Sequence, residues 1–201
     1  GGPAPDGPQV RACREYLARL RERRDVVARA DAKLTVVDAV APALAGTRSL
    51  VFTDTVEQAE SARARLRTAG RDAVTLHGEL TTRQRRGRLA AFRRGDVEVV
   101  VAPRVLDEGV DVPDAEVAVV LAAFRTRRQS VQRLGRVLRV KHDGRQARLV
   151  LAAARDTAED PARGGHGAFL GQVRAVARSI DHLDVGADPA ALTRWLSDSR
   201  G

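Results

Sequence analysis

The sequence predicts an α/β fold in which a parallel sheet carries helices on both faces. Short apolar runs such as SLVFTD (49–54) indicate buried strands. Helical segments alternate with these runs and end at a glycine, as 57–69 does at Gly70 and 82–94 does at Gly95. This alternation is typical of a parallel sheet, because neighbouring parallel strands need a long crossover connection that a helix usually supplies.

The elements follow one another in a regular order along the chain. We expect strands over 49–54, 72–76, 97–102, 116–122 and 146–152, and intervening helices over 57–69, 82–94 and 128–139. Further helices are expected over 9–30, over 31–46 (with Asp31 as N-cap and Gly46 as the stop), over 168–181 and over 189–198. The predicted domain division is a lead-in with a helical segment (1–46), an α/β domain (47–154) and a C-terminal helical extension (155–201).

The composition favours a polyanionic partner and limits how it is bound. The 201 residues carry a formal net charge of +9, and Lys33 and Lys141 are the only lysines, so the basic residues are nearly all arginine. Nucleic acid is the first partner that such a balance indicates. Aromatic residues make up only 3% of the chain, too few for a base-stacking platform. Contacts with nucleic acid are therefore expected mainly at backbone phosphates.

Cysteine usage and hydropathy bear on the compartment. Cys13 is the only cysteine, which excludes an intrachain disulfide and a cysteine zinc site and fits a reducing cytosol. The longest apolar run, 117–124, is too short to cross a bilayer, and no signal peptide is recognisable. We therefore expect a cytoplasmic protein with no membrane partner. The Gly-Gly-Pro start indicates a piece excised from a longer protein.

The segment QRLGRVLR (132–139) is the most distinctive stretch of the chain. Gln132, Arg136 and Arg139 stand at i, i+4 and i+7, which places them on one face of a helix. The rigid fork of donors in arginine matches phosphate oxygens two at a time. The stretch thus predicts a phosphate-binding helix, although a solvated basic face remains the alternative.

The chain lacks the glycine-rich phosphate loop of nucleotide-binding proteins. That loop ends in Gly-Lys-Ser/Thr, and neither Lys33 nor Lys141 follows a glycine. The Asp-Glu pair in VLDEG (105–109) is expected in a loop, and no metal site is predicted. The chain is therefore not expected to cradle the β- and γ-phosphates of a nucleotide in that way.

Three segments together resemble a known motor family. LVFTDTVEQAE (50–60) looks like motif IV, VVVAPRVLDEGVDVPDA (99–115) like motif V and RRQSVQRLGRVLR (127–139) like motif VI. In this order and context they resemble the C-terminal RecA-like lobe of superfamily 2 DEAD/DEAH-type helicases. The sequence over about 49–154 is most similar to that of the XPB-like DNA helicases of archaea and bacteria.

The resemblance implies roles for residues near a nucleotide. In such helicases two lobes close on ATP, and the N-terminal lobe carries the phosphate loop and the acids that bind Mg²⁺. Arg136 and Arg139 would act as catalytic arginine fingers on the γ-phosphate, and Gln132 would position the nucleotide or the interface of the lobes. Gly109 and Asp111 would also bind the nucleotide, although a plain turn remains the alternative for them.

The resemblance also implies a nucleic-acid rim. Thr53, His77, Gly78 and Arg104 are the matching positions. The alternatives are that His77 only caps a strand and that Thr53 and Asp54 only cap the next helix. Arg85 and Arg88 (next helix) are expected to be solvated.

Motif V departs from the family at one point. Ala102 and Pro103 stand where many members have threonine or cysteine, so a hydroxyl contact with the nucleic-acid backbone would be lost.

Two functions of different classes follow. The first is the C-terminal motor lobe of an ATP-dependent DNA helicase or translocase, inactive without its N-terminal lobe, which would lie in the same polypeptide. DNA is the expected partner, RNA is not excluded, and a protein could bind through the terminal helices. The alternative is a non-catalytic basic module that binds nucleic acid or protein and keeps the fold.

Overall fold

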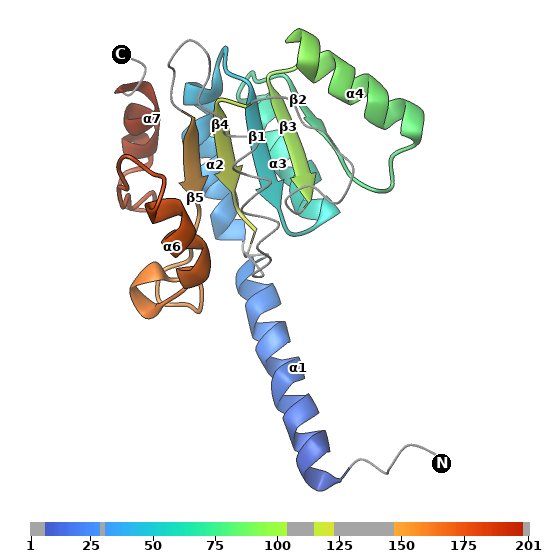
Figure 1. The fold of residues 1–201 in the computed structure, drawn as a ribbon. Helices are drawn as coiled ribbons and strands as arrows, with labels where there is room; N and C mark the ends of the chain where they lie inside the picture. The colour runs from blue at the N-terminus through green and yellow to red at the C-terminus, as the bar shows by residue number, and fades with distance from the viewer. Residues whose placement is uncertain (1–6, 29–30, 104–114, 123–146, 199–201) are drawn as a thin grey trace.

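The sheet is the centre of the molecule. A computed structural model describes residues 7–28, 31–103, 115–122 and 147–198. All neighbouring strands are parallel, in the order β2-β3-β1-β4-β5. The strands are β1 (Ser49–Thr53), β2 (Ala73–Thr75), β3 (Val99–Pro103), β4 (Val117–Val120) and β5 (Arg148–Leu151) (Figure 1). The predicted α/β class and all five predicted strands are confirmed.

Two helices that follow strands begin and end where the sequence predicts, within a residue or two. In α3 (Val56–Thr68) the side chain of Thr55 accepts a hydrogen bond from the backbone N–H of Gln58 at 3.1 Å. In α4 (Thr82–Arg94) Thr81 and Gln84 form a capping box. Gly95 then ends α4 at φ 85°, a conformation that only glycine adopts without strain.

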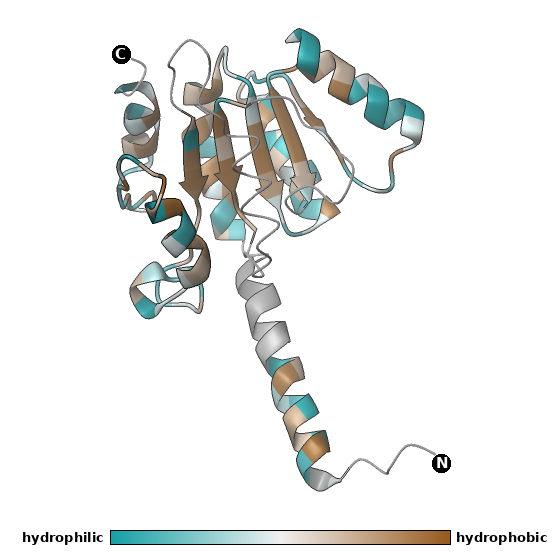
Figure 2. Ribbon diagram, viewed as in Figure 1, coloured by the Kyte–Doolittle hydropathy of each residue, from teal (hydrophilic) through white to brown (hydrophobic). Residues whose placement is uncertain are grey.

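The central strands β1, β3 and β4 bury nearly all of their side chains on both faces, which is why they are mostly apolar (Figure 2). Alternate residues of a strand point to opposite faces. Val51, Val99, Val101, Val117 and Val119 share one core cluster with residues of α2 (Leu34–Val40), α3 and α7 (Pro189–Asp198). Leu50, Phe52, Val100, Ala118 and Val120 share the other with Phe92 of α4 and Phe169 of α6 (Gly167–Arg174). Helices therefore cover both faces, as predicted.

The segment over 31–46 is not the single helix that the sequence predicts. It divides into η1 (Asp31–Lys33), α2 and η2 (Ala41–Leu44). Pro42 has no N–H to continue the α-helical hydrogen bonds, so the chain tightens into a 3₁₀ turn. The prediction that Asp31 is the N-cap is also wrong, because Lys33 holds that position before α2 and makes no side-chain cap bond.

The C-terminal region contains η3 (Pro161–Arg163), α6 and α7. The predicted helix over 189–198 is confirmed, but the helix predicted over 168–181 ends at Arg174. The N–H groups of Val176 and Ala177 both bond to the Val173 carbonyl and close the last turn. Val176 is 84% exposed, so a longer helix would gain little apolar burial there.

The terminal segments differ in how they relate to the sheet. Helix α1 (Pro8–Ala28) extends away from it (Figure 1), with Val10, Tyr16 and Leu17 exposed. In contrast, α2 and α7 pack together, and Thr193 donates a hydrogen bond to the Ala39 carbonyl. The domain division at residues 46 and 154 stays a prediction. Within the described ranges, every helix is too short or too polar to span a bilayer.

Candidate nucleic-acid interface

The carboxyl ends of β1, β2 and β3 lie side by side at one edge of the sheet. Thr53 ends β1 and is paired with Pro103 at the end of β3, while Thr75 at the end of β2 is paired with Val101. His77 and Gly78 follow β2 after one residue. In open parallel sheets ligands bind at this edge, so the structure brings three predicted rim residues, Thr53, His77 and Gly78, to a suitable place.

Thr53 is fully buried, and its hydroxyl serves the turn into α3. It donates a hydrogen bond to the Thr55 carbonyl at 3.0 Å. The N–H of Asp54 donates to the Gln58 side chain at 3.0 Å. The alternative that Thr53 and Asp54 cap α3 is wrong, since Thr55 is the cap. Thr53 therefore shapes the backbone of the rim rather than presenting its hydroxyl to solvent.

His77 lies between two carboxylates. Its Nε2 is 3.7 Å from Oε1 of Glu60 on α3, and its Nδ1 is 3.9 Å from Oε2 of Glu79. The side chain is 9% exposed, and Nδ1 has no hydrogen-bond partner within the described part of the chain. A buried polar atom without a partner is costly, which makes His77 a candidate for contact with a ligand.

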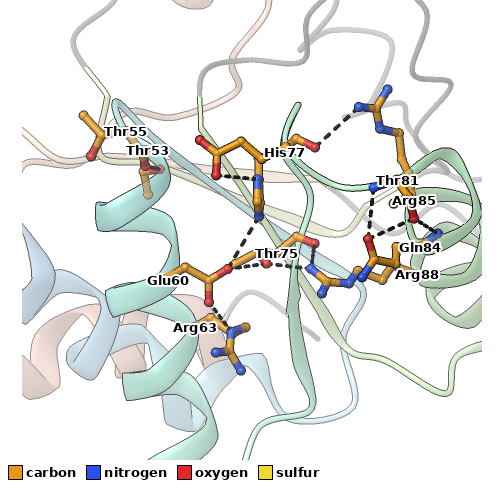
Figure 3. A network of polar contacts seen from close by, with 11 residues as sticks. Thr53, Thr55, Glu60, Arg63, Thr75, His77, Thr81, Gln84, Arg85 and Arg88 are labelled. Atoms are coloured by element: carbon orange, nitrogen blue, oxygen red, sulfur yellow. Dashed lines mark hydrogen bonds and ion pairs between the residues drawn. The ribbon is translucent and has the colours of Figure 1, made fainter.

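A polar network that sequence reasoning missed fixes the end of β2 (Figure 3). Thr75 donates to Glu60 at 2.7 Å, and Arg88 of α4 donates to both the carbonyl and the hydroxyl of Thr75 at 2.7 Å. Arg63 bonds the other oxygen of Glu60 at 2.8 Å. The Thr75 hydrogen bond is the main cause that lowers the pKa of Glu60 below its usual 4.5. The network thus ties α3 and α4 to the strand end with an ionised carboxylate at its centre.

Two arginines of this network were expected to be solvated, and that expectation is wrong. Arg88 is half-buried against Thr75, and half-buried Arg85 donates to the His77 carbonyl at 3.4 Å. Both share the inner face of α4 with Leu89 and Phe92, at helical spacing from them. That spacing was the signal in the sequence that could have located them.

Gly78 has no structural need to be glycine within the described ranges. Its φ lies outside the left-handed region, and a Cβ there would meet no atom within 4 Å. The residue is exposed beside His77. Space of this kind lets a phosphate approach the backbone N–H groups closely.

The remaining predicted site residues lie outside the described residues. These are Arg104, Gly109, Asp111, Gln132, Arg136 and Arg139. The segments that carry them begin at the sheet edge already described, after Pro103 of β3 and after Ala122 beyond β4. Within the described ranges no group of three or more His, Cys, Asp or Glu side chains could hold a metal ion.

A buried ion pair holds the end of β4. Lys33 Nζ lies 2.6 Å from Oε2 of Glu159 and donates to the Leu121 carbonyl at 2.9 Å. Both side chains are below a tenth exposed. The turn that carries Glu159 closes tightly, since a Cβ at Gly165 would lie 2.1 Å from the Glu159 carbonyl carbon. Burial lowers the pKa of neighbouring His166 below 6.5, with Glu159 opposing and Lys33 adding to the shift.

Comparison with known proteins gives consistent matches. Residues 32–141 match the helicase conserved C-terminal domain. The DNA 3'-5' helicase XPB of Kineococcus radiotolerans is 33% identical over 154 residues, which is 76% of this chain and 27% of that protein. The putative DNA 3'-5' helicase Rad25 of Halobacterium salinarum is 36% identical over 148 residues, 73% of this chain and 23% of that protein. The chain thus spans about a quarter of the length of these relatives.

A solved structure gives the same result for the fold. The C-terminal domain of the DEAD-box protein Dbp5 superposes with a TM-score of 0.63, at 17% identity, over 86% of this chain and 93% of that one. This likeness supports the RecA-like fold. Together with the sequence matches, it confirms the predicted resemblance to the C-terminal lobe of superfamily 2 helicases.

Proposed function

The chain belongs to the family of the helicase conserved C-terminal domain, and from this premise we propose that it is the second motor lobe of an ATP-dependent DNA helicase or translocase. The observation that carries the proposal is the match of residues 32–141 to the helicase conserved C-terminal domain. The match spans β1 to β4 and includes the segment 132–139 with Arg136 and Arg139. Two relatives that match most of this chain are named DNA 3'-5' helicases.

The proposed chemistry divides between two lobes. ATP with Mg²⁺ would be held mainly by an N-terminal lobe in the same polypeptide. Arg136 and Arg139 would enter the cleft from this lobe and stabilise the charge on the transferring phosphoryl group, a role worth about 10³–10⁵ in rate where it has been measured. Gln132, Gly109 and Asp111 would contact the nucleotide. The segment with Gly109 and Asp111 follows the end of β3, and the segment with Gln132, Arg136 and Arg139 comes after β4. Both strands end at the carboxyl edge of the sheet, which supports a shared site.

The same edge is proposed to hold the DNA backbone. His77, Gly78 and Arg104 would contact phosphates, and Thr53 would hold the turn that shapes the rim. Within the described residues Nδ1 of His77 makes no hydrogen bond, and the space at Gly78 is open; both observations support this assignment. Affinity is expected to fall steeply with salt and to vary little with base sequence, because phosphate contacts release counterions.

The rim can be tested with one matched pair of variants. In Gly78→Leu a side chain would project into the space that a phosphate is proposed to occupy. Gly171→Leu adds the same side chain on α6, where a Cβ also has no atom within 4 Å. Only Gly78→Leu should weaken DNA binding, measured by fluorescence anisotropy with folding checked by circular dichroism. Equal affinities of the two variants would contradict the rim assignment.

The motor itself is tested by ATP hydrolysis. This chain alone should hydrolyse no ATP, whereas the polypeptide that includes the N-terminal lobe should hydrolyse it and be stimulated by DNA. Robust hydrolysis by the chain alone would contradict the proposal that ATP is bound mainly by the N-terminal lobe. Absence of hydrolysis in both, with DNA binding intact, would favour the non-catalytic binding module, and stimulation by RNA but not DNA would reassign the substrate.

A further inference from the structure

Helix α4 has a second face that the nucleic-acid rim does not use. Its thirteen residues include six arginines and no aspartate or glutamate. Arg85 and Arg88 are directed inward to His77 and Thr75. The other four, Arg83, Arg86, Arg93 and Arg94, are exposed.

The four exposed arginines lie on one side of the helix. At 100° per residue, positions 83, 86, 93 and 94 fall within about a third of a turn. Figure 2 shows hydrophilic residues along most of α4. In Figure 1 the helix lies on the β2 side of the sheet, away from α6 and α7. The face formed by Arg83, Arg86, Gly87, Ala90, Arg93 and Arg94 is named the outer face of α4; Ala90 is partly buried and the other five residues are exposed.

Nearby acids neutralise only part of this charge. Asp96 pairs with Arg94 at 2.6 Å, and Glu79 lies near the start of the helix with its side chain 75% exposed. Across the described ranges, no acidic side chain forms an ion pair with Arg83 or Arg86. These two guanidiniums, one turn apart, are the centre of the basic surface.

Small residues lie between the arginines. Gly87 occupies the interior of the helix, where glycine is unfavourable, and a Cβ there would meet no atom within 4 Å. The described residues therefore give no packing reason for glycine at this position. Gly87 has no side chain and Ala90 only a methyl group, so little projects from the centre of the outer face. A large anionic surface can therefore lie close to the helix.

We propose that the outer face of α4 binds the phosphate backbone of duplex DNA next to the strand held on the rim. This inference rests on the proposed function, since it assumes that the motor acts on DNA. The helix is about 20 Å long, which matches roughly six base pairs of duplex. It begins four residues after Gly78, so the two surfaces are continuous. The capping box and the hydrogen bonds of Arg85 and Arg88 attach the helix to the end of β2, with the outer face on the opposite side.

The test compares two double variants of the 201-residue chain. Arg83→Gln with Arg86→Gln removes two charges from the outer face and keeps good helix formers. Arg174→Gln with Arg178→Gln removes two exposed charges elsewhere and is the control. Affinity for a labelled duplex and for the matching single strand is measured by anisotropy across a salt series, with circular dichroism as the check on folding.

The outer-face variant should bind duplex on the order of tenfold or more weakly at about 0.1 M salt, with a salt slope smaller by roughly 1.8. Single-strand affinity and the control should change little. Duplex affinity equal to that of the control would overturn the proposal, as would a selective loss of binding to polyglutamate, which would assign the surface to an acidic protein. If the unaltered chain bound neither DNA, the DNA-binding part of the proposed function would fail as well.

Discussion

Removing one partner of the ion pair between Lys33 and Glu159 should lower the free energy of unfolding strongly. Replacing both partners by apolar residues should change it little. At 2.6 Å the attraction is roughly 6 kcal/mol for an effective dielectric constant of about 20. Removing two ions from water costs several kcal/mol for each, which offsets that gain. In Lys33→Met the Glu159 carboxylate would stay buried without its cation. We expect this variant to lose about 3–5 kcal/mol of the free energy of unfolding.

The double variant Lys33→Met with Glu159→Leu removes both charges. It should lie within about 2 kcal/mol of the wild-type chain or be more stable, because neither charge is left uncompensated. Urea denaturation followed by far-ultraviolet circular dichroism measures both values, and Lys33→Met should also lower Tm by roughly 6–20 °C.

An exposed pair supplies the control. Arg194 and Asp188 have side chains that are 60% and 50% exposed, so Arg194→Gln should cost less than about 1 kcal/mol. If Lys33→Met is no more damaging than Arg194→Gln, the pair does not hold the end of β4. If the double variant loses as much free energy of unfolding as Lys33→Met and Glu159→Leu lose together as single variants, the reasoning on desolvation is wrong.

Three further predictions concern stability. Burial lowers the pKa of His166, so on acidification the unfolded chain binds this proton before the folded chain does. The free energy of unfolding should therefore be constant above about pH 6.5 and fall below it, and it should fall less in His166→Gln. Urea titrations at several pH values would measure this. Gly87→Ala should raise the free energy of unfolding by about 0.5–1 kcal/mol, because its Cβ has open space, and a decrease would show a missed contact. Thr55→Ala should cost about 1 kcal/mol through loss of the cap of α3, and Thr55→Ser should restore most of it.

The order of strands and helices was predictable because it depends on local patterns. Apolar runs bounded by turn residues located all five strands, and Gly70 and Gly95 located the ends of α3 and α4. Pro42 breaks the helix predicted over 31–46, and a proline inside a helical pattern is itself a sequence signal for such a break. The end of α6 at Arg174 depends instead on how little Val176 can bury, which periodicity does not reveal.

The candidate site was predictable only where a motif marked it. His77 and Gly78 follow β2 at the carboxyl edge of the sheet, and their contact with nucleic acid stays a prediction. Glu60 and Thr75 come from different elements and meet only in the folded chain, as do Lys33 and Glu159. Such pairs cannot be recognised from a short stretch of sequence, because their partners are far apart along the chain and meet only when it folds.

The most direct test of the motor assignment is DNA-stimulated ATP hydrolysis by the longer polypeptide proposed to include an N-terminal lobe, comparing Arg136→Ala with Arg174→Ala. Arg174 is an exposed arginine at the end of α6 and controls for the loss of one charge. We expect Arg136→Ala to abolish hydrolysis while DNA binding persists, and Arg174→Ala to leave both intact. Hydrolysis by Arg136→Ala at the rate of the control would contradict the assignment of Arg136 as an arginine finger.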